Sequence, residues 1–521
     1  MADLRSTVRR KTLFTLSFIV LLAVLLFAAA QGSHIRSDWS DNQTSSISSS
    51  TKQVLQGLDE PIQIKAYFTT GLPQPYGQLK QFVEDTLLNY RDAANGNLGF
   101  EMINPEDNPN TQTSLQALQI PKVQVQVIED DRAQVRQAYL AIVIEYLDKQ
   151  EIIPVVQTDA GFEYLLTRKI KKLTGKGKQT IAVATGFGAK SSQELQTLQQ
   201  LLQDDYNFVD VDLATAAVPS AAKALIVAGV DKKPSEMFRY HLDQFRMTGN
   251  GVLVLASNVE PNLQAGFQVL PVDTYANDWL LADLGVSVES GLVMDQQASR
   301  ITVNQQQGGF AFSSVVDFPF IPNVVNINKN SVITQGLESV SMPFTAPLLW
   351  AKHSASKQTL LTSSEWTAVQ SGPPFDVNPL INIRERFQGL QQSPQALMLV
   401  QEGAMTSAFK KALVDGEHVG SVVEGRLLVS GSSALLDNEF IDGQNTVLIL
   451  NMLDWLSHDE ALIELRSKGV TQRPLEPLAK QGRTFFKLVW MLALPALLLS
   501  LAGWRWLYLR KRRSKTWEQN T

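Results

Sequence analysis

Two uncharged apolar runs, one near each end of the chain, constrain the architecture more than any other feature of the sequence. The first, Thr12–Ala30, has only hydroxyls as polar groups, and the second, Leu488–Trp504, has no charged side chain. At a rise of about 1.5 Å per residue, helices of about this length cross the ~30 Å hydrocarbon core of a bilayer. Pro495 predicts a kink in the second run, a defect that helices in lipid tolerate. We therefore expect transmembrane helices at 12–30 and 485–509.

Basic side chains flank both runs on the sides that face the chain ends. They are Arg9, Arg10 and Lys11 before the first run, and Arg510, Lys511, Arg512 and Arg513 after the second. Because positive charge marks the cytoplasmic side of a span, we expect cytoplasmic tails at 1–11 and 510–521 and export of residues ~32–484. These seven basic residues are the candidate anchoring groups, and the lipid bilayer is their expected partner.

Both runs have a second interpretation. Ala28-Ala29-Ala30 offers a small-residue cleavage site, which would make the N-terminal segment a signal peptide, although its apolar run exceeds the usual ~7–15 residues. A buried C-terminal core helix would account for the apolar residues 488–504. It would not account for the basic cluster that follows them.

The net charge of −5 over 521 residues conceals an uneven distribution. Residues 1–11 carry +3 and residues 505–521 carry +5, whereas residues 12–504, with 36 basic and 49 acidic side chains, carry −13. An acidic body disfavours binding to nucleic acid, and we expect the basic cluster between Arg168 and Lys178 to be a solvated linker face. The chain has no cysteine, which excludes disulfides, thiolate nucleophiles and cysteine-ligated metal centres.

The region between the apolar runs has an α/β pattern. Ile62–Phe68 alternates apolar and polar side chains as a half-buried strand does, and helical spacing follows it. Further along, short uninterrupted apolar runs are typical of strands covered on both faces. We expect a small αβ domain at 31–174 and a doubly wound α/β domain at 175–484. The pattern weakens at about 258–394, which indicates a large insertion with its own sheet.

Few motifs in this region point to chemistry. Gly186-Phe187-Gly188 and Lys190 follow a predicted strand, where phosphate loops lie, but the rest of the dinucleotide fingerprint is missing and a tight turn also explains the glycines. Ser432 and Ser433 follow another strand without the closing glycine of a nucleophile elbow. We keep Gly186, Gly188, Lys190, Ser432 and Ser433 as a candidate ligand site. We assign no catalytic residue, metal ligand or cofactor, because the histidines lack a dense ligand spacing.

Short motifs occur in a fixed order along the chain. They include Asp38-Trp39-Ser40 with Ser46-Ile47-Ser48, then Leu58-Asp59-Glu60-Pro61, Ile153-Pro154, Phe162-Glu163-Tyr164, Asp454-Trp455-Leu456 and Arg466-Ser467-Lys468. Together they resemble the GldG-like family, auxiliary components of ABC-type transport systems associated with gliding motility in some bacteria. Trp39 and Ile47 stand where that family favours leucine.

The resemblance implies a subunit of the bacterial inner membrane that works beside a separate ATPase and a permease. It also implies that the larger domain has the flavodoxin-like fold of class I glutamine amidotransferases. Enzymes with that fold use a cysteine nucleophile, and this chain has none. The resemblance therefore carries architecture and partners but no catalytic residue.

These observations predict a non-enzymatic auxiliary subunit of an ABC-type, gliding-type complex, whose periplasmic domains act as a scaffold or binding module. Two alternatives stay open. One is an exported protein that binds or senses cell-envelope polysaccharide at the switch point near 186–190 and 430–433. The other is a divergent serine hydrolase that uses Ser432 or Ser433.

Overall fold

The computed structural model of the chain describes residues 46–466, apart from short gaps at 130–131, 160, 176–177, 263–267, 274, 308–309, 415–416 and 461–462, and the single positions 487, 500, 503 and 506. The chain forms two compact units, 1–470 and 471–521. All the elements below belong to the first unit, in which a smaller and a larger sheet each have a hydrophobic core.

The smaller sheet has the strand order β2-β1-β5-β6. Its strands are β1 (Ile62–Phe68), β2 (Leu98–Ile103), β5 (Leu140–Tyr146) and β6 (Lys149–Ile153), and its helices are α2 (Ser49–Gln56), α3 (Tyr76–Ala93), α4 (Pro109–Ala117) and α5 (Phe162–Thr174). The crossover through α3 makes β1 and β2 parallel, whereas β5 is antiparallel to β1. Val83 and Leu87 of α3 pack with Ile64 of β1, so one stripe of this helix closes the core. A separate hairpin pairs β3 (Val123–Glu129) with β4 (Arg132–Ala138).

The larger sheet contains a parallel part in the order β8-β7-β9-β10-β23. Its strands are β7 (Gln179–Thr185), β8 (Tyr206–Asp212), β9 (Ala222–Ala228), β10 (Gly251–Leu255) and β23 (Ser421–Ser430). If these strands are numbered along the chain, their order across the sheet is 2-1-3-4-5. This is one of the common orders of doubly wound sheets. After β7 the chain continues to β8 on one side of it, and then crosses to β9 on the other side. The topological switch point therefore lies between β7 and β9.

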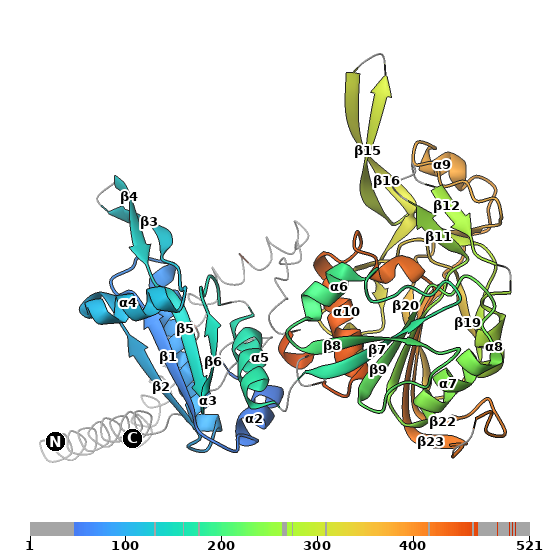
Figure 1. Ribbon diagram of the computed structural model, residues 1–521. Helices are drawn as coiled ribbons and strands as arrows, with labels where there is room; N and C mark the ends of the chain where they lie inside the picture. The colour runs from blue at the N-terminus through green and yellow to red at the C-terminus, as the bar shows by residue number, and fades with distance from the viewer. Residues whose placement is uncertain are drawn as a thin grey trace, which may run out of the picture. The chain divides into compact units, whose positions relative to one another are not determined.

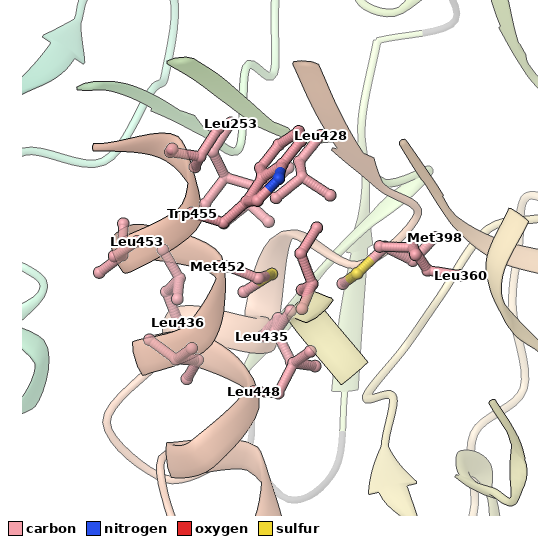
Figure 2. Close-up of a cluster of buried hydrophobic side chains, with 14 of the residues drawn as sticks. Leu253, Leu360, Met398, Leu428, Leu435, Leu436, Leu448, Met452, Leu453 and Trp455 are labelled. Carbon is pink, nitrogen blue, oxygen red and sulfur yellow. The ribbon is translucent and has the colours of Figure 1, made fainter. Parts of the chain in front are cut away.

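Helices cover both faces of the larger sheet (Figure 1). They are α6 (Gln196–Leu202) and α10 (Gly443–Leu456) on one face, and α7 (Glu236–Met247) and α8 (Asp278–Leu284) on the other. Successive residues of a strand point to opposite faces, so Leu253 packs with α10 and Val254 with α7. Figure 2 shows the first of these clusters, in which Trp455 of α10 lies against Leu253 and Leu428 of the sheet. This two-sided burial explains the uninterrupted apolar strands of the sequence.

The chain between β10 and β23 contributes several small sheets and extends the larger one. The pairs and short sheets are β11 (Val259–Asn262) with β12 (Gln268–Pro271), β14 (Leu292–Asp295) with β21 (Thr367–Gln370), and β15 (Ala298–Gln307), β16 (Phe310–Val324) and β18 (Val340–Ser341). β22 (Ala396–Thr406) lies antiparallel to β23 and carries the larger sheet on to β13 (Val286–Val288), β17 (Asn326–Ile327), β19 (Leu348–Trp350) and β20 (Lys357–Thr362). The short helix α9 (Ile383–Arg386) lies in the same region.

The expected fold class is wrong in one respect: a two-span membrane protein is not supported. Within the part of the chain that the structure describes, every helix is too short or too polar to cross a membrane. The longest helix in that part, α3, has 18 residues and includes Lys80, Glu84 and Arg91. The two expected spans, 12–30 and 485–509, lie outside the described residues except at 487, 500, 503 and 506. The seven basic residues expected to anchor them, Arg9, Arg10, Lys11, Arg510, Lys511, Arg512 and Arg513, also lie outside the described residues.

Candidate functional site

The carboxyl ends of the parallel strands bring several loops together at the switch point. These loops are 186–190 after β7, 229–231 after β9, 256–257 after β10 and 431–433 after β23. Backbone hydrogen bonds tie the loop after β7 to the end of β9 and to the loop that follows it: Lys190 N–H donates to Ala228 O at 2.8 Å, and Asp231 N–H donates to Phe187 O at 3.0 Å. The Phe187 ring packs edge-on against Phe238 of α7, with 5.6 Å between ring centroids. The loop after β7 is therefore held on both sides.

Three consecutive residues of this loop have left-handed backbone conformations, with φ of +96° at Gly186, +53° at Phe187 and +81° at Gly188. A Cβ placed on Gly188 would lie 1.8 Å from Asp231 Oδ1, and one on Gly186 would lie 3.2 Å from Asp212 Oδ1. Glycine is therefore required at Gly188 by both the backbone conformation and the close approach of a carboxylate. A tight turn packed against the loop after β9 explains both glycines.

Lys190 reaches across the sheet edge to Asp437, with which its ammonium group forms a hydrogen-bonded ion pair. The side chains are 13% and 19% exposed, so water screens the pair only partly. Burial raises the pKa of Asp437, and the neighbouring Lys190 cation opposes that shift. Because a carboxylate already neutralises it, the Lys190 ammonium has little charge left for an anionic ligand.

A small cavity lies where these loops meet. It has a volume of about 10 Å³, which matches about one water molecule. The residues that line it are Lys190, Gly229, Val230, Asp231, Ser257, Glu260, Val272 and Ser433. The buried Oδ1 atom of Asp231 has no hydrogen-bond partner among the described residues, so a water molecule there would have an acceptor to bind.

The predicted site residues are brought together only in part. Lys190 and Ser433 line the same cavity, whereas Gly186 and Gly188 lie against Asp212 and Asp231. Ser432 is fully buried, and its hydroxyl donates to the Pro343 carbonyl oxygen. Ser433 is 4% exposed and begins the 3-10 turn η3 (Ser433–Leu436). The residues that line the cavity beside Ser433 include no histidine.

A larger cavity of about 600 Å³ lies beside the amino-terminal ends of β7 and β8. Its charged lining residues are Arg168, Lys171, Lys172, Lys178, Asp204, Asp205, Lys223 and Asp459. Arg168 pairs with Asp205, Lys171 pairs with Asp459, and Lys172 lies 3.5 Å from Asp204. Glu151 of β6 also pairs with this cluster, at 2.7 Å from Lys169 and 2.8 Å from Lys172. The basic cluster that we expected to be a solvated linker face thus meets acidic partners from the smaller sheet and from the loops before β8 and after α10.

A buried polar network joins three parts of the fold that the sequence motifs treated separately. Arg466 donates to Asp454 Oδ2 at 2.6 Å and to Tyr164 Oη at 3.3 Å, and Tyr206 donates to Asp454 Oδ1 at 2.9 Å. The Asp454 and Arg466 side chains are 3% and 5% exposed. Burial raises the pKa of Asp454, and the Arg466 charge opposes this effect. The network links α10, the start of β8 and α5.

Sequence reasoning missed the role of this network, although a signal was present. Asp454 is the charged residue inside the otherwise uncharged helix α10, Gly443–Leu456. A carboxylate inside an apolar helix is rarely buried without a cationic partner, and Arg466 follows it twelve residues later. In the described part of the chain, His, Asp and Glu side chains do not gather in threes in a way that would hold a metal ion.

Comparisons with known proteins place these features in a family context. A family model described as an ABC-type uncharacterized transport system matches residues 178–459, and a model for a domain of unknown function, DUF7088, matches residues 41–145. An uncharacterized protein of Borreliella burgdorferi is 20% identical over 444 residues, which cover 83% of this chain and 84% of that protein. The first match covers more than half of the chain, from the start of β7 to beyond α10.

Among solved structures, the chain is similar to the mmIFT52 N-terminal domain. The identity is 14% and the TM-score is 0.33, over 53% of this chain and 97% of that domain. A TM-score this low does not establish a shared fold.

Proposed function

The chain belongs to the family described as an ABC-type uncharacterized transport system, and on this premise we propose that it is a non-enzymatic auxiliary subunit of such a system. It acts as a scaffold or binding module beside the ATPase and permease subunits. The observation that carries the proposal is the family match, because it spans the whole doubly wound region from β7 to α10.

The contacts of the motif residues support a role as a scaffold. Tyr164, Asp454 and Arg466 are engaged with one another in a buried network and do not line either of the cavities described above. Arg466 donates through both terminal nitrogens, while its buried Nε has no partner among the described residues. The hydrogen bonds that are made hold the contributing elements in one arrangement. The motifs thus stabilise the geometry of the chain, which is the property a scaffold needs.

The switch point supports the same proposal. Lys190 is neutralised by Asp437, and the cavity beside it holds about one water molecule. Ser432 uses its hydroxyl in a structural hydrogen bond to Pro343. These groups stabilise the loops at the sheet edge, and a role in assembly requires no chemistry from them.

Co-purification from the native host tests the assignment to a transport complex. We expect the tagged full chain to recover an ATP-binding-cassette ATPase and a multi-span permease in fixed ratio, as identified by mass spectrometry. Lys149→Ala, at an exposed position on β6, is the matched surface control and should recover both. Recovery of the chain alone, under conditions that preserve other transport complexes, would contradict the proposal.

A covalent probe tests the non-enzymatic part of the proposal. The purified full chain should not be labelled by a fluorophosphonate, because Ser432 and Ser433 are buried and hydrogen-bonded or enclosed. Labelling that is retained in Ser432→Ala but lost in Ser433→Ala, or the reverse, would identify a serine nucleophile. That result would replace the scaffold assignment with a hydrolase.

A further inference from the structure

The cavity of about 600 Å³ beside the amino-terminal ends of β7 and β8 is not used by the proposed function. Its volume lies within the range of about 300–1,000 Å³ that is typical of pockets for small molecules. The charged side chains that line it are five cations and three carboxylates, namely Arg168, Lys171, Lys172, Lys178 and Lys223, and Asp204, Asp205 and Asp459. The lining therefore carries a charge of +2, although residues 12–504 as a whole carry −13.

The positive excess is concentrated on two lysines that belong to the larger sheet and its approach. The three cations that α5 contributes to the lining each pair with a carboxylate. Lys178, which precedes β7, donates to the carbonyl oxygen of Gln203. Among the described residues, no carboxylate forms an ion pair with Lys178 or with Lys223 of β9. Both side chains are exposed, so their charges are available to an anion in the cavity.

A shift in strand register accounts for the position of Lys223. Thr180 of β7 lies opposite Ala222 of β9, and the next residue of β7 lies opposite Ala224, so Lys223 is an extra residue as in a β-bulge. Ala222 packs on the face of α7 and Ala224 on the face of α10, whereas residues two apart in a regular strand share a face.

The charge of Lys223 is also out of place in its strand. It is the charged residue of Ala222–Ala228, an otherwise apolar strand that lies between β7 and β10 inside the sheet. Bulges re-aim side chains and are frequent beside functional sites. Lys223 and Thr180, the two sides of this irregularity, both line the cavity.

We propose that this cavity binds a small molecule that carries a phosphate monoester. Such a group carries about −1.5 to −2 at pH 7, which matches the two unpaired ammonium groups of Lys178 and Lys223, and lysine is a common phosphate ligand. The cavity is much larger than a phosphate group, so the ligand has an organic part as well. A long polyanion would be repelled by the acidic body around the cavity. The inference does not rest on the proposed role in transport.

Calorimetric titration of the full chain tests the ligand class. Glucose 6-phosphate, glycerol 3-phosphate and AMP are the probes, and we expect at least one of them to bind saturably at one site per chain. Glucose, adenosine, inorganic phosphate and citrate should bind at least about tenfold more weakly, because each lacks the phosphate monoester, the organic part or both. Absence of saturable binding by all three probes, equally tight binding of citrate, or binding only to phosphatidylglycerol vesicles would overturn the proposal.

Substitution of the two lysines locates the site. Lys223→Gln and Lys178→Gln should each weaken binding at least about tenfold, because each removes a charge-assisted hydrogen bond, whereas Lys223→Arg should retain it. Lys329→Gln, at an exposed position outside the cavity lining, is the matched control and should bind as the wild type does. Because both lysines are exposed, the glutamine variants should keep the urea midpoint of the wild type.

The outcomes of this test are separate from those of co-purification. Probe affinity that is unchanged in both glutamine variants would place the ligand elsewhere and overturn the proposal. Recovery of the ATPase and the permease would be unaffected by that result, and their absence would not alter the affinity of the purified chain for a phosphate monoester.

Discussion

At Gly188, the backbone conformation and the local packing both exclude a side chain. The residue has a φ of +81°, and an added Cβ would lie 1.8 Å from Asp231 Oδ1. Gly96, which follows α3, has a φ of +94° and nothing within 4 Å of its added Cβ. The two glycines therefore separate the cost of a left-handed conformation from the cost of a steric clash.

Alanine at these two positions should have unequal effects. Gly96→Ala should lower the free energy of unfolding by about 1 kcal/mol, the cost of the backbone conformation alone. Gly188→Ala should cost about 1–3 kcal/mol more, because the loop after β9 must move. Urea unfolding of the full chain measures both. Adding Asp231→Ala to Gly188→Ala should recover part of the loss, and equal losses for the two single variants would contradict the clash.

The sequence predicts which residues meet at the candidate site, but it does not predict the interactions that those residues make there. Lys190 and Ser433 both follow parallel strands, and the carboxyl ends of such strands meet at one sheet edge. Asp437, which neutralises Lys190, lies beyond a 3-10 turn whose path depends on packing with distant residues. The volume of a cavity also depends on all of its neighbours, so the sequence could not indicate that it holds only about one water molecule.

At the scale of secondary-structure elements, the Asp454–Arg466 pair connects α10 to β8 and α5. Asp454→Asn should lower the free energy of unfolding by about 3–5 kcal/mol, because it leaves the Arg466 cation buried without its counter-ion. Tyr206→Phe should cost less, about 1.5–3 kcal/mol, the net value of one hydrogen bond to a charged group. Thermal and urea unfolding measure these differences. Asp454→Leu/Arg466→Met should be less destabilising than Asp454→Asn, and the reverse order would contradict the explanation.

The carboxylate of Glu464 connects helix α2 to the segment that ends at Arg466. It accepts hydrogen bonds from Ser49 and Ser50 at the start of the helix. Burial alone would raise the pKa of Glu464, but the hydrogen bonds from Ser50 and Ser49 outweigh it, so the pKa lies below its ordinary value of 4.5. A carboxyl whose pKa is lowered by folding stabilises the fold above its ordinary pKa. That stabilisation is lost as the pH falls through the lowered value.

This connection predicts a pH-dependent effect of Glu464→Gln. At pH 7 the substitution should lower the free energy of unfolding by about 1 kcal/mol, because a charge-assisted hydrogen bond is replaced by neutral ones. The difference from the wild type should shrink as the pH falls below 4.5. Melting temperatures between pH 7 and pH 3 measure it, with Glu84→Gln, at an exposed position on α3, as control. A difference that stays constant with pH would show that Glu464 acts through packing alone.

The sequence predicts whether a segment is a helix or a strand better than it predicts the direction of a strand or the strand it pairs with. The uninterrupted apolar strands and the strand–helix rhythm after Gln179 follow from two-sided burial, which leaves a local signal in the sequence. β22 has the same apolar pattern as its parallel neighbours but runs antiparallel to β23. Direction is set by how the preceding chain returns to the sheet. The sequence did not predict the ribbon β15–β16 either, because its Gln, Gly and Ser residues are typical of irregular segments.

At the scale of the whole chain, the family match ends before the fold does. The match stops at residue 459, whereas Arg466, the counter-ion of Asp454, and the buried side chains of Ile463 and Leu465 come after it. The first compact unit extends to Val470. The folded unit therefore extends past the family match, at least to Arg466, the residue that pairs with the buried Asp454 carboxylate.

Two truncations test that boundary. A chain that ends at Val470 should unfold at nearly the same urea concentration as the full chain, because the cut falls between the compact units. A chain that ends at Asp459 should lose at least about 3 kcal/mol, because it leaves the Asp454 carboxylate buried without its cation. In the second chain alone, Asp454→Asn should be stabilising, since it removes the orphaned charge, whereas in the full chain it should be destabilising. The same sign in both chains would mean that Arg466 does not set the boundary.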